Sequence, residues 1–432
     1  MLKNTKKRAA LHNLGCRVNS YETECMTALL KEDGYEIVPF SEEAEVYVIN
    51  TCTVTQIADK KSRQMLRRAR AKNPSAIIVA TGCYVQTDPE KIIAECGVDI
   101  MIGNNEKSSL CQKIREFEQK NTRPDIPMPS EDFSGYNEMF LTDTSEHTRA
   151  FMKVQDGCNQ FCSYCMIPYA RGRVRSRKIA NAVEEAKNLA QKGYKEVVLT
   201  GIHLGSFGYD SGERLIDLIK NVSEIEGIER VRFGSLEPMV MSEEFVKELS
   251  GIPEICPHFH LSLQSGSDTV LERMNRHYTA DQFAESCDRL RFYFDRPAIT
   301  TDIIAGFPGE TDKEFNESLE FVKKTGFYQM HVFPYSVRPG TRAAKMGGQI
   351  KKSVKEERAG ILIAESKKMS EIYENSLSGK TLSVLFEEES EEGILTGFCR
   401  EYVRIYSGRS KDDIGKIITG SVNMSISGRL EM

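Results

Sequence analysis

Short apolar runs alternate with helical patterns over the first 117 residues. Apolar residues at helical spacing predict helices over about residues 20–31 and 56–71, and Asp88-Pro89 predicts a third helix start. The apolar runs between them are too short for helices and are typical of buried strands, at residues 9–14, 46–49, 76–80 and 98–102. This order predicts βαβ units, and hence an open parallel sheet, in an N-terminal α/β domain of residues 1–117.

Residues 118–145 are a polar and turn-rich stretch that we interpret as a linker. After it, apolar runs and helical patterns alternate again over a longer part of the chain. Each of six apolar runs precedes a helical pattern, at residues 151–154, 197–200, 231–235, 259–263, 299–304 and 330–333. Six such units predict an incomplete (β/α)6 TIM-like barrel over residues 146–372. Its chemistry is expected at the carboxyl ends of the strands.

The pattern changes again beyond a helix that ends near Asn375. Five short runs alternate apolar and polar residues, at residues 382–386, 394–398, 403–406, 416–419 and 424–427. Short strands at close spacing predict a small all-β barrel over residues 373–432.

Composition narrows the class of protein without assigning a function. The 432 residues are enough for two or three domains, and a formal net charge of −5 gives no global attraction to nucleic acid. No apolar run approaches the roughly 20 residues that cross a membrane, and the basic residues 1–8 lead into no apolar segment of the kind that export signals contain. We therefore expect a cytoplasmic protein without membrane contact, whose twelve cysteines are metal ligands or buried thiols rather than disulfides.

Three cysteines stand close together after the first predicted strand of the barrel. Cys158, Cys162 and Cys165 have the spacing C-x3-C-x2-C. Three thiolates can hold three corners of a 4Fe–4S cluster, and since no fourth cysteine follows nearby, the last iron keeps an open position. A zinc site is the alternative, but structural zinc favours paired C-x2-C knuckles and four ligands. We therefore predict a 4Fe–4S cluster that can bind a small chelating ligand.

Three further cysteines each follow a predicted strand of the N-terminal domain. Cys16, Cys52 and Cys83 come after its first three strands, and in an open α/β sheet ligands bind where the carboxyl ends of the strands meet. Any one of them alone could be a small buried hydrophobic residue, but three at the same structural position favour a second three-cysteine cluster. The other cysteines share no such pattern and are interpreted as structural: Cys25, Cys96, Cys111, Cys256, Cys287 and Cys399.

Local groups of basic residues are candidates for RNA contact in a chain that is acidic overall. A predicted helix of the N-terminal domain carries Lys60, Arg63 and Arg67, which either contact phosphates or form a solvated face. In the C-terminal barrel, Arg400 and Arg404 stand among tyrosines, and RNA can use such a combination of aromatic and basic residues.

A second basic group alternates directly after the three-cysteine loop of the barrel. Arg171, Arg173, Arg175 and Arg177 would share one side of an extended segment. There they could contact RNA phosphates or, beside the cluster, the carboxylate of a cofactor; Arg171, Arg173 and Arg175 are also the candidates for an acidic group of the substrate, and the alternative is a plain exposed basic strand.

The loop of residues 158–165, with Tyr164 before its last cysteine, resembles the signature of radical S-adenosylmethionine (SAM) enzymes. The resemblance implies that SAM chelates the open iron, lies with its adenine near Tyr164, and is split by an electron into methionine and a 5′-deoxyadenosyl radical. His203, at the rim of the barrel, is interpreted as a packed or solvated histidine rather than a ligand. Other rim residues resemble the SAM cradle of these enzymes, although each is also ordinary turn chemistry: Gly201, Ser235, Glu237, Gln264, Ile304, Gly306 and Pro308.

The whole chain is similar to the radical SAM methylthiotransferase family. The resemblance is carried by Gly-Cys-Arg-Val-Asn around Cys16, Asn-Thr-Cys-Thr-Val-Thr around Cys52, Gly-Cys-Tyr around Cys83, and a C-terminal barrel that resembles a TRAM RNA-binding domain. It implies a transferase with two 4Fe–4S clusters, in which Cys16, Cys52 and Cys83 hold the auxiliary cluster that carries the sulfur. One SAM would methylate that sulfur, and a second would yield the radical that removes hydrogen from the substrate carbon. The implied partners are tRNA, a reducing electron donor such as flavodoxin or ferredoxin, and a sulfur donor.

The sequence around Cys16 and Cys52 resembles that of the family branch that acts on N6-threonylcarbamoyladenosine at position 37 of tRNA, next to the anticodon. The isopentenyladenosine branch usually has Gln-Met-Asn after the first cysteine, and the branch that modifies a ribosomal-protein aspartate has Pro-Lys-Asn. Arg17 stands where the threonylcarbamoyladenosine branch more often has lysine. The alternative from another class is a non-catalytic iron–sulfur protein that binds RNA, which the two cysteine triads and the polar barrel rim disfavour.

Overall fold

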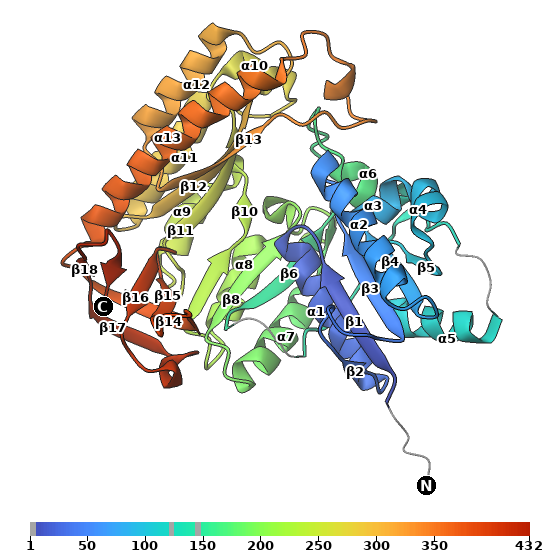
Figure 1. Cartoon of the computed structure of the whole chain (residues 1–432). Helices are drawn as coiled ribbons and strands as arrows, with labels where there is room; N and C mark the ends of the chain where they lie inside the picture. Colours follow the sequence, from blue (N-terminus) through green and yellow to red (C-terminus); the bar gives the residue numbers. More distant parts are fainter. Residues whose placement is uncertain (1–5, 121–124, 143–147) are drawn as a thin grey trace.

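The computed structural model describes residues 6–120, 125–142 and 148–432. Figure 1 shows an α/β domain (blue to cyan), an arc of strands backed by helices (green to orange) and a small β module (red). The N-terminal domain and the C-terminal module both pack on the arc, because buried residues of the arc belong to the core of each: Ala150 and Leu189 to the first, Ala298 and Tyr328 to the second.

Five parallel strands form the sheet of the N-terminal domain in the order β2-β1-β3-β4-β5. Their bounds are β1 (Arg8–Asn13), β2 (Glu36–Ile37), β3 (Val46–Thr51), β4 (Ile77–Gly82) and β5 (Ile100–Ile102). The predicted open parallel sheet is confirmed, and β2 is an addition, since two residues are too few to give a strand pattern. The chain order reverses between β1 and β3, the position where open α/β sheets bind ligands.

Helices cover both faces of this sheet. Met26 of α1 and Ile114 of α5 pack on one face, and Leu66 of α2 and Ile92 of α4 pack on the other. Helix α2 begins where the side chain of Thr55 accepts a hydrogen bond from the backbone N–H of Ala58 (3.1 Å). The helices are α1 (Arg17–Glu32), α2 (Gln56–Lys72), α3 (Cys83–Thr87), α4 (Pro89–Cys96) and α5 (Leu110–Lys120), with a 3-10 turn η1 (Lys107–Ser109).

The six predicted barrel strands are β6 (Ala150–Asp156), β8 (Glu196–Gly201), β9 (Arg230–Phe233), β11 (His258–Gln264), β12 (Ala298–Ala305) and β13 (Gln329–Pro334). The third predicted strand is interrupted at Gly234. Before the interruption β9 pairs with β8, and after it β10 (Ser235–Leu236) pairs with β11. This strand joins two four-stranded sheets, β7-β6-β8-β9 and β10-β11-β12-β13, into the predicted incomplete barrel; β7 (Arg175–Ser176) is antiparallel to β6.

Side chains of the barrel strands alternate between the covering helices and the interior. Ile299 and Ile303 of β12 belong to the main hydrophobic core, so Thr300 and Asp302 between them point inward. The polar interior therefore follows from the strand period. The helices are α6 (Ile167–Arg171), α7 (Ile179–Gln191), α8 (Leu215–Ser223), α9 (Glu243–Ser250), α10 (Asp268–Arg273), α11 (Ala280–Tyr293), α12 (Asp312–Thr325) and α13 (Lys352–Leu377), with 3-10 turns η3 (Leu204–Ser206), η4 (Pro238–Val240) and η5 (Ala343–Lys345).

The C-terminal module is one curled sheet in the order β17-β14-β15-β16-β19-β18. The strand predicted over residues 424–427 is wrong beyond Met424, because the chain turns at Gly428 (φ +74°) and returns as β19. Helix α13 extends to Leu377, past the predicted boundary at residue 373. The strands are β14 (Thr381–Glu389), β15 (Leu395–Cys399), β16 (Arg404–Ser407), β17 (Ile417–Ser421), β18 (Asn423–Met424) and β19 (Leu430–Glu431), with a 3-10 turn η6 (Lys411–Asp413).

The stretch interpreted as a linker is bound to the N-terminal domain where it is described. It contains a 3-10 turn, η2 (Ser130–Asp132). The hydroxyl of Tyr21 donates to the carbonyl of Met139 (2.7 Å), and the side-chain amide of Gln86 donates to the carbonyl of Met128 (2.7 Å). Of the predicted linker, residues 121–124 and 143–145 lie outside the described residues. Within the described part of the chain, no helix combines the length and the apolar character needed to cross a membrane.

Candidate active site between two cysteine triads

A cavity of about 640 Å³ lies between the carboxyl ends of the barrel strands and the N-terminal domain. Cys158, Cys162 and Cys165 line it from the barrel, and Cys16 lines it from the loop between β1 and α1. The structure therefore brings Cys16 of one predicted cysteine group and all three cysteines of the other to one cavity, although the two groups are far apart in the sequence.

The loop that carries the barrel cysteines is fixed by backbone contacts from outside it. Gly157 has φ +72°, and a Cβ there would lie 1.8 Å from the carbonyl oxygen of Arg173, so only glycine fits. The N–H of Cys158 donates to the carbonyl of Gly172 (3.0 Å), and the N–H of Ser163 donates to the carbonyl of Met274 (2.9 Å). The three thiols are thus held in place by the fold.

Each sulfur of this loop accepts a hydrogen bond from an N–H group. The backbone N–H of Gln160 lies 3.5 Å from Cys158 Sγ, and that of Ile167 lies 3.4 Å from Cys165 Sγ. The guanidinium of Arg276 donates to Cys162 Sγ at 3.2 Å. Such donors favour thiolates over thiols, which is the state that iron requires.

Arg276 also joins the cysteine loop to the rim of the barrel. Its guanidinium donates to the carboxylate of Glu237 (2.5 Å) and to the hydroxyl of Tyr278 (2.9 Å). The ring of His203 lies 3.5 Å from the other oxygen of Glu237. Burial alone would raise the pKa of Glu237, but Arg276 and His203 together lower that pKa below its usual value, so the carboxylate stays ionised at the cavity wall.

The second triad gathers at the carboxyl ends of β1, β3 and β4. Cys16 is exposed to the cavity, whereas Cys52 and Cys83 are buried behind it. A Cβ at Gly15 would lie 3.0 Å from Cys52 Sγ, and the pKa of Cys52 is raised by burial first and then by the nearby Cys83 and Cys16. The three thiols are therefore near neighbours, as the strand-end positions predict.

Asn19, in the motif around Cys16, ties the strand ends together. Its side-chain amide donates to the carbonyl of Leu14 (2.7 Å) and to the carbonyl of Thr51 (3.1 Å), which precede Cys16 and Cys52 in the chain. The hydroxyl of Thr51 in turn donates to the carbonyl of Thr81 (2.6 Å). This chain of hydrogen bonds sets the spacing of the three loops.

A buried ionic network lies beneath the second triad. Arg171 donates through Nε to Cys83 Sγ (3.3 Å) and through its terminal nitrogens to Glu22 (2.8 Å), to Asp156 (3.1 Å) and to Asn19 (2.7 Å). Three further buried cations surround these carboxylates: Lys153 contacts both, Lys107 contacts Glu22, and Arg175 contacts Asp156. Four cations thus surround two carboxylates, and one of the arginines connects the network to a cysteine.

Burial raises the pKa of three of these thiols. It raises the pKa of Cys52, Cys158 and Cys165 to about 12. A bound cation reverses this preference, because a coordinating thiol loses its proton. The donor set therefore fits iron held as thiolate complexes rather than free thiolates.

The residues predicted to cradle SAM divide into two groups. Tyr164, Gly201, Ser235 and Glu237 line the cavity beside the cysteine loop. The others do not line this cavity: Gln264, Ile304, Gly306 and Pro308. Gly306, for example, donates its N–H to the carboxylate of Glu310 (2.9 Å) and has φ +73°, which are the features of a structural turn.

The alternating arginines do not share one exposed side, so that expectation is wrong. Arg171, Arg175 and Arg177 are buried, and only Arg173 is exposed. The segment is not uniformly extended, because Arg171 ends helix α6 and Gly172 then turns with φ +69°. The guanidinium of Arg175 donates to two backbone carbonyls, those of Arg171 and Arg173 (2.8 Å each).

The other basic candidates differ in their exposure and in the contacts that they already make. Lys60 is exposed, while Arg63 donates to the hydroxyl of Tyr84 (2.6 Å). Arg67 donates to Glu95 (2.9 Å), and Arg404 donates to Glu388 (2.6 Å). Arg400 donates to backbone carbonyls of the barrel, those of Pro253 and Ile255 (2.7 Å to the latter), so it fastens the C-terminal module to the barrel.

The sequence patterns missed the polar wall opposite the cysteine loop. His258, His260 and Thr300, together with Asp302 and His331, line the same cavity from β11, β12 and β13. Burial lowers the pKa of His258 well below its usual value, so that ring is neutral. These residues lie within their strands, before the carboxyl ends. The residues predicted from the rim loops lie at or after those ends. Strict inward alternation along each strand is the signal that could have found them.

Two residues from the other domains complete the cavity wall. Arg17 reaches it from the N-terminal domain and Tyr402 from the C-terminal module, and the guanidinium of Arg17 lies 3.4 Å from the hydroxyl of Tyr402. Tyr402 has φ +65° and stacks on the ring of His258 at 4.7 Å. The cavity therefore belongs to all three parts of the chain.

Two family models match the chain. The Radical SAM superfamily matches residues 152–322, and the Uncharacterized protein family UPF0004 matches residues 8–103. The first range contains the barrel cysteine loop, and the second contains all three cysteines of the other triad.

Relatives extend over almost the whole chain. Threonylcarbamoyladenosine tRNA methylthiotransferase MtaB of Bacillus subtilis (strain 168) is 42% identical over 419 residues, which are 95% of this chain and 92% of the relative. The protein of the same name from Thermotoga maritima is 38% identical over 399 residues, 92% of this chain and 91% of the relative. The chain belongs to the radical SAM methylthiotransferase family.

This methylthiotransferase is also similar to a relative with a different name and to solved structures of radical SAM enzymes. The tRNA-2-methylthio-N(6)-dimethylallyladenosine synthase of Clostridium botulinum (strain Loch Maree / Type A3) is 34% identical, over 94% of this chain and 92% of the relative. Among solved structures, the radical SAM methyltransferase TsrM from Kitasatospora setae, with cobalamin and a [4Fe-4S] cluster bound, has a TM-score of 0.61 at 14% identity. That match covers 78% of this chain and 77% of TsrM, and it shows a shared fold.

The methylthiotransferase uses SAM and two 4Fe–4S clusters as cofactors. Its residues fit them, because each triad presents sulfur atoms with N–H donors or a cation alongside, and the cavity between the triads has room for small ligands. Three sulfur ligands from each triad would leave one iron of each cluster open to another ligand.

Proposed function

We propose that this chain is a transferase that replaces the C2 hydrogen of N6-threonylcarbamoyladenosine, at position 37 of tRNA, with a methylthio group. The observation that carries the proposal is the shared cavity, in which Cys16 faces the loop of Cys158, Cys162 and Cys165. A reaction that joins a radical source to a sulfur carrier needs both groups within reach of one substrate atom.

The choice among branches is supported by the relatives. Four relatives named threonylcarbamoyladenosine tRNA methylthiotransferases match at 38–42% identity, against 34% for the dimethylallyladenosine synthases. The tRNA substrate is also supported by a C-terminal module with the predicted β-barrel architecture, which contributes Tyr402 to the cavity. A non-catalytic RNA-binding role gives no reason for the two triads to meet.

The roles of the chain's own residues follow from their positions. Cys158, Cys162 and Cys165 would hold one cluster, and Cys16, Cys52 and Cys83 the other. When bound there, the cofactors supply an electron, a radical, a methyl group and a sulfur atom. Tyr164, Gly201, Ser235 and Glu237 would bind SAM beside the first cluster, and Arg276 holds Glu237 and Cys162 in a fixed relation.

Arg17 is the residue best placed to recognise the carboxylate of the threonylcarbamoyl group. It lines the cavity, and among the described residues no ion pair of 4 Å or less joins it to a carboxylate. Its cationic fork can bind a carboxylate through two parallel hydrogen bonds. Of the basic residues that follow the cluster loop, Arg171 and Arg175 already donate to Glu22 and to backbone carbonyls.

The anticodon arm would approach across the groove beside α2. Lys60 and Arg63 line a groove of about 520 Å³ between α2 and the segment that contains Arg338. Arg67, Arg173 and Arg404 lie at exposed positions and would add phosphate contacts, whereas Arg400 would act by positioning the C-terminal module.

The reaction also requires partners. We propose that a reducing protein such as flavodoxin or ferredoxin supplies electrons to the barrel cluster, and that a sulfur donor renews the sulfur at the other. Because the substrate is tRNA, the protein would act in the cytoplasm.

Mass spectrometry of modified nucleosides tests the proposed function. The enzyme, reconstituted with both clusters under anaerobic conditions, is incubated with SAM, a reductant and tRNA carrying threonylcarbamoyladenosine, isopentenyladenosine or unmodified adenosine. We expect the methylthio product from the first tRNA and almost none from the others. Comparable rates on isopentenyladenosine would contradict the substrate assignment, and 5′-deoxyadenosine without any methylthio product would contradict the reaction.

A further inference from the structure

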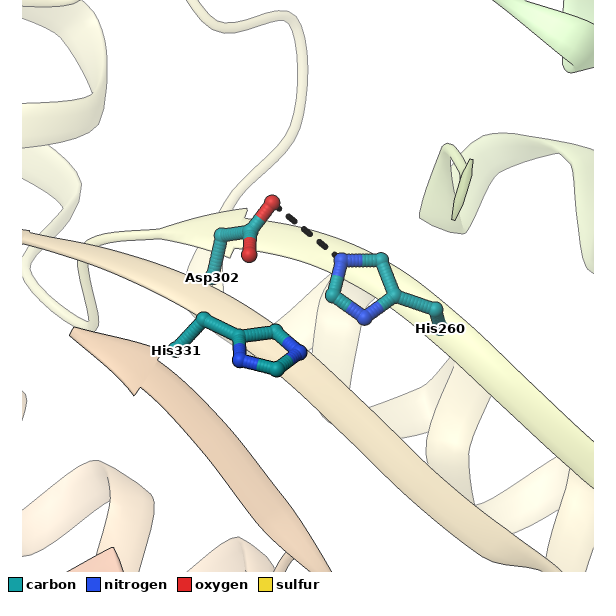
Figure 2. Close-up of side chains that lie close together, drawn as sticks. All are labelled: His260, Asp302 and His331. Carbon is teal, nitrogen blue, oxygen red and sulfur yellow. Dashed lines mark ion pairs between the residues drawn. The ribbon is translucent and has the colours of Figure 1, made fainter. Parts of the chain in front are cut away.

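Three side chains of the barrel interior converge on one point of the cavity wall. His260 of β11, Asp302 of β12 and His331 of β13 offer ligand atoms that all lie within 4.8 Å of one another (Figure 2). Figure 2 shows the two imidazole rings and the carboxylate turned toward a common space above the three strands. The group contains no cysteine, so it is distinct in chemistry from both triads.

The strand register sets this convergence. Asp302 and His331 are direct partners across β12 and β13, while His260 is the partner of Thr300 across β11 and β12. Thr300 and Asp302 are two residues apart and therefore share one face of the sheet. All four side chains point into the cavity by the same alternation, so no special loop conformation is needed to bring them together.

Hydrogen bonding fixes the orientation of His260. Its Nδ1 lies 3.0 Å from the hydroxyl of Thr300, and its Nε2 lies 3.2 Å from a carboxylate oxygen of Asp302. A partner on one ring nitrogen is what holds a metal-binding histidine in its tautomer and direction. Two ligands about 2.1 Å from a metal and at right angles to each other are about 3 Å apart, so the 3.2 Å separation matches neighbouring ligands of one ion.

We propose that His260, Asp302 and His331 form a binding site for one divalent transition-metal ion. Two imidazoles and one carboxylate on one side of an ion suit Fe²⁺, Mn²⁺ or Zn²⁺ rather than Mg²⁺ or Ca²⁺, which prefer oxygen ligands alone. The remaining coordination positions face the cavity that also holds Cys16 and Cys158. An ion there can take an oxygen atom of a bound substrate as a further ligand.

Manganese binding to the holoenzyme tests the site without any tRNA, so the outcome is independent of the proposed function. The probe is Mn²⁺, titrated into enzyme whose two clusters are filled and oxidised, while electron paramagnetic resonance measures the six-line signal of free Mn²⁺. We expect one Mn²⁺ to bind per chain and Zn²⁺ to displace it, because nitrogen ligands favour zinc over manganese.

Variants assign the binding to these residues. Asp302→Asn and His331→Gln should abolish binding, and Thr300→Val, which removes the partner of His260 Nδ1, should weaken it by about 10-fold or more. His277→Gln is the matched control, since His277 is exposed outside the cavity. Iron content equal to that of the unchanged enzyme shows that each variant is folded. Absence of Mn²⁺ binding, or the same binding in Asp302→Asn and His331→Gln, would overturn the proposal.

Discussion

At the scale of single residues, neighbours in one basic segment have opposite surroundings. Arg171 is fully buried and donates to Glu22, Asp156 and Cys83, whereas Arg173, two positions later, is exposed. Composition and alternation treat the two alike, because the difference arises from Gly172, which turns the chain between them. Arg171 is therefore placed to act through Cys83 and not by contact with RNA.

Replacing Arg171 by methionine should therefore destabilise the protein strongly. Two buried carboxylates would lose a shared cation, and breaking a buried ion pair from one side costs about 3–5 kcal/mol. Denaturant unfolding of the metal-free protein measures this loss. Arg173→Met is the matched control; it removes only a contact of the guanidinium with the ring of Phe161 (4.6 Å) and should change the free energy of unfolding by about 1 kcal/mol or less. Equal effects of the two substitutions would contradict the buried network.

Arg17 gives a second prediction at this scale, on specificity. If Arg17 binds the substrate carboxylate, Arg17→Gln should lower kcat/KM for tRNA with threonylcarbamoyladenosine by roughly 10- to 100-fold, the effect of losing a charge-assisted hydrogen bond. Arg17→Lys keeps the charge but not the planar fork, so its kcat/KM should lie between that of the unchanged enzyme and that of Arg17→Gln. Steady-state kinetics measures the effect, and Arg214→Gln, at an exposed pair with Asp217, is the control. An unchanged kcat/KM in Arg17→Gln would remove Arg17 from substrate recognition.

At the scale of elements, the ends of β3 and β4 must approach closely to bring Cys52 and Cys83 together. Gly82 ends β4 with φ +98°, and a Cβ there would lie 2.4 Å from the backbone oxygen of Thr51. The contact involves backbone on one side and cannot relax by a rotamer change. Glycine at this position is therefore a requirement of the cysteine site.

Gly82→Ala should separate the two strand ends and weaken the auxiliary cluster. We expect the iron content of the reconstituted protein to fall by up to about half, while the barrel cluster remains. Gly193→Ala is a matched control, because Gly193 has φ +90° but open space around it. It carries the backbone strain without the clash, at a cost of about 1–2 kcal/mol, and should keep its iron. Loss of iron in both variants would show that strain, and not the contact, is responsible.

Elements with a strong period were predictable from sequence, and interruptions were not. The strands β3, β6, β12 and β13 overlap the apolar runs that predicted them. The interruption at Gly234 and the two-residue strand β2 left no apolar pattern of their own. The cysteines could be located because strand ends are visible in the sequence, whereas Asn19, Arg276 and the wall of β11–β13 depend on tertiary contacts and register.

At the scale of the whole molecule, the C-terminal module is joined to the barrel by buried arginines. Arg230 and Arg232 of β9 pair with Glu196 and donate to carbonyls of the module, among them that of Ser383 (2.7 Å) and that of Arg400 (2.9 Å). Because the module also supplies Tyr402 to the cavity, removing it would alter the active site itself. Truncation is therefore no clean test of RNA binding.

Glu196 balances this interface, so Glu196→Gln should be destabilising. Burial alone would raise the pKa of Glu196, but Arg232, with Arg149 and Arg230, lowers it to about 2. Replacing this carboxylate leaves buried arginines unpaired. The free energy of unfolding, measured with denaturant, should therefore fall by about 3–5 kcal/mol. Glu229→Gln, at an exposed pair with Lys195, is the control and should stay within about 0.5 kcal/mol.

The same residue sets a pH dependence. A lowered pKa means that the stabilisation is present above the unfolded value near 4.5 and is lost as the pH falls toward about 2. Between about pH 5 and pH 3, the unchanged protein should lose more stability than Glu196→Gln, since only the former can take up this proton. Parallel losses in the two proteins would show that Glu196 does not titrate in this way.

The central claim is that two separate clusters face one cavity, and iron analysis with SAM cleavage tests it most directly. The reconstituted chain should hold about eight iron ions, and replacing Cys158, Cys162 and Cys165 by alanine should leave about four and no 5′-deoxyadenosine. Replacing Cys16, Cys52 and Cys83 should also leave about four, with 5′-deoxyadenosine still formed and no methylthio product. About four iron ions in the unchanged protein, or loss of SAM cleavage in both triple variants, would contradict the account.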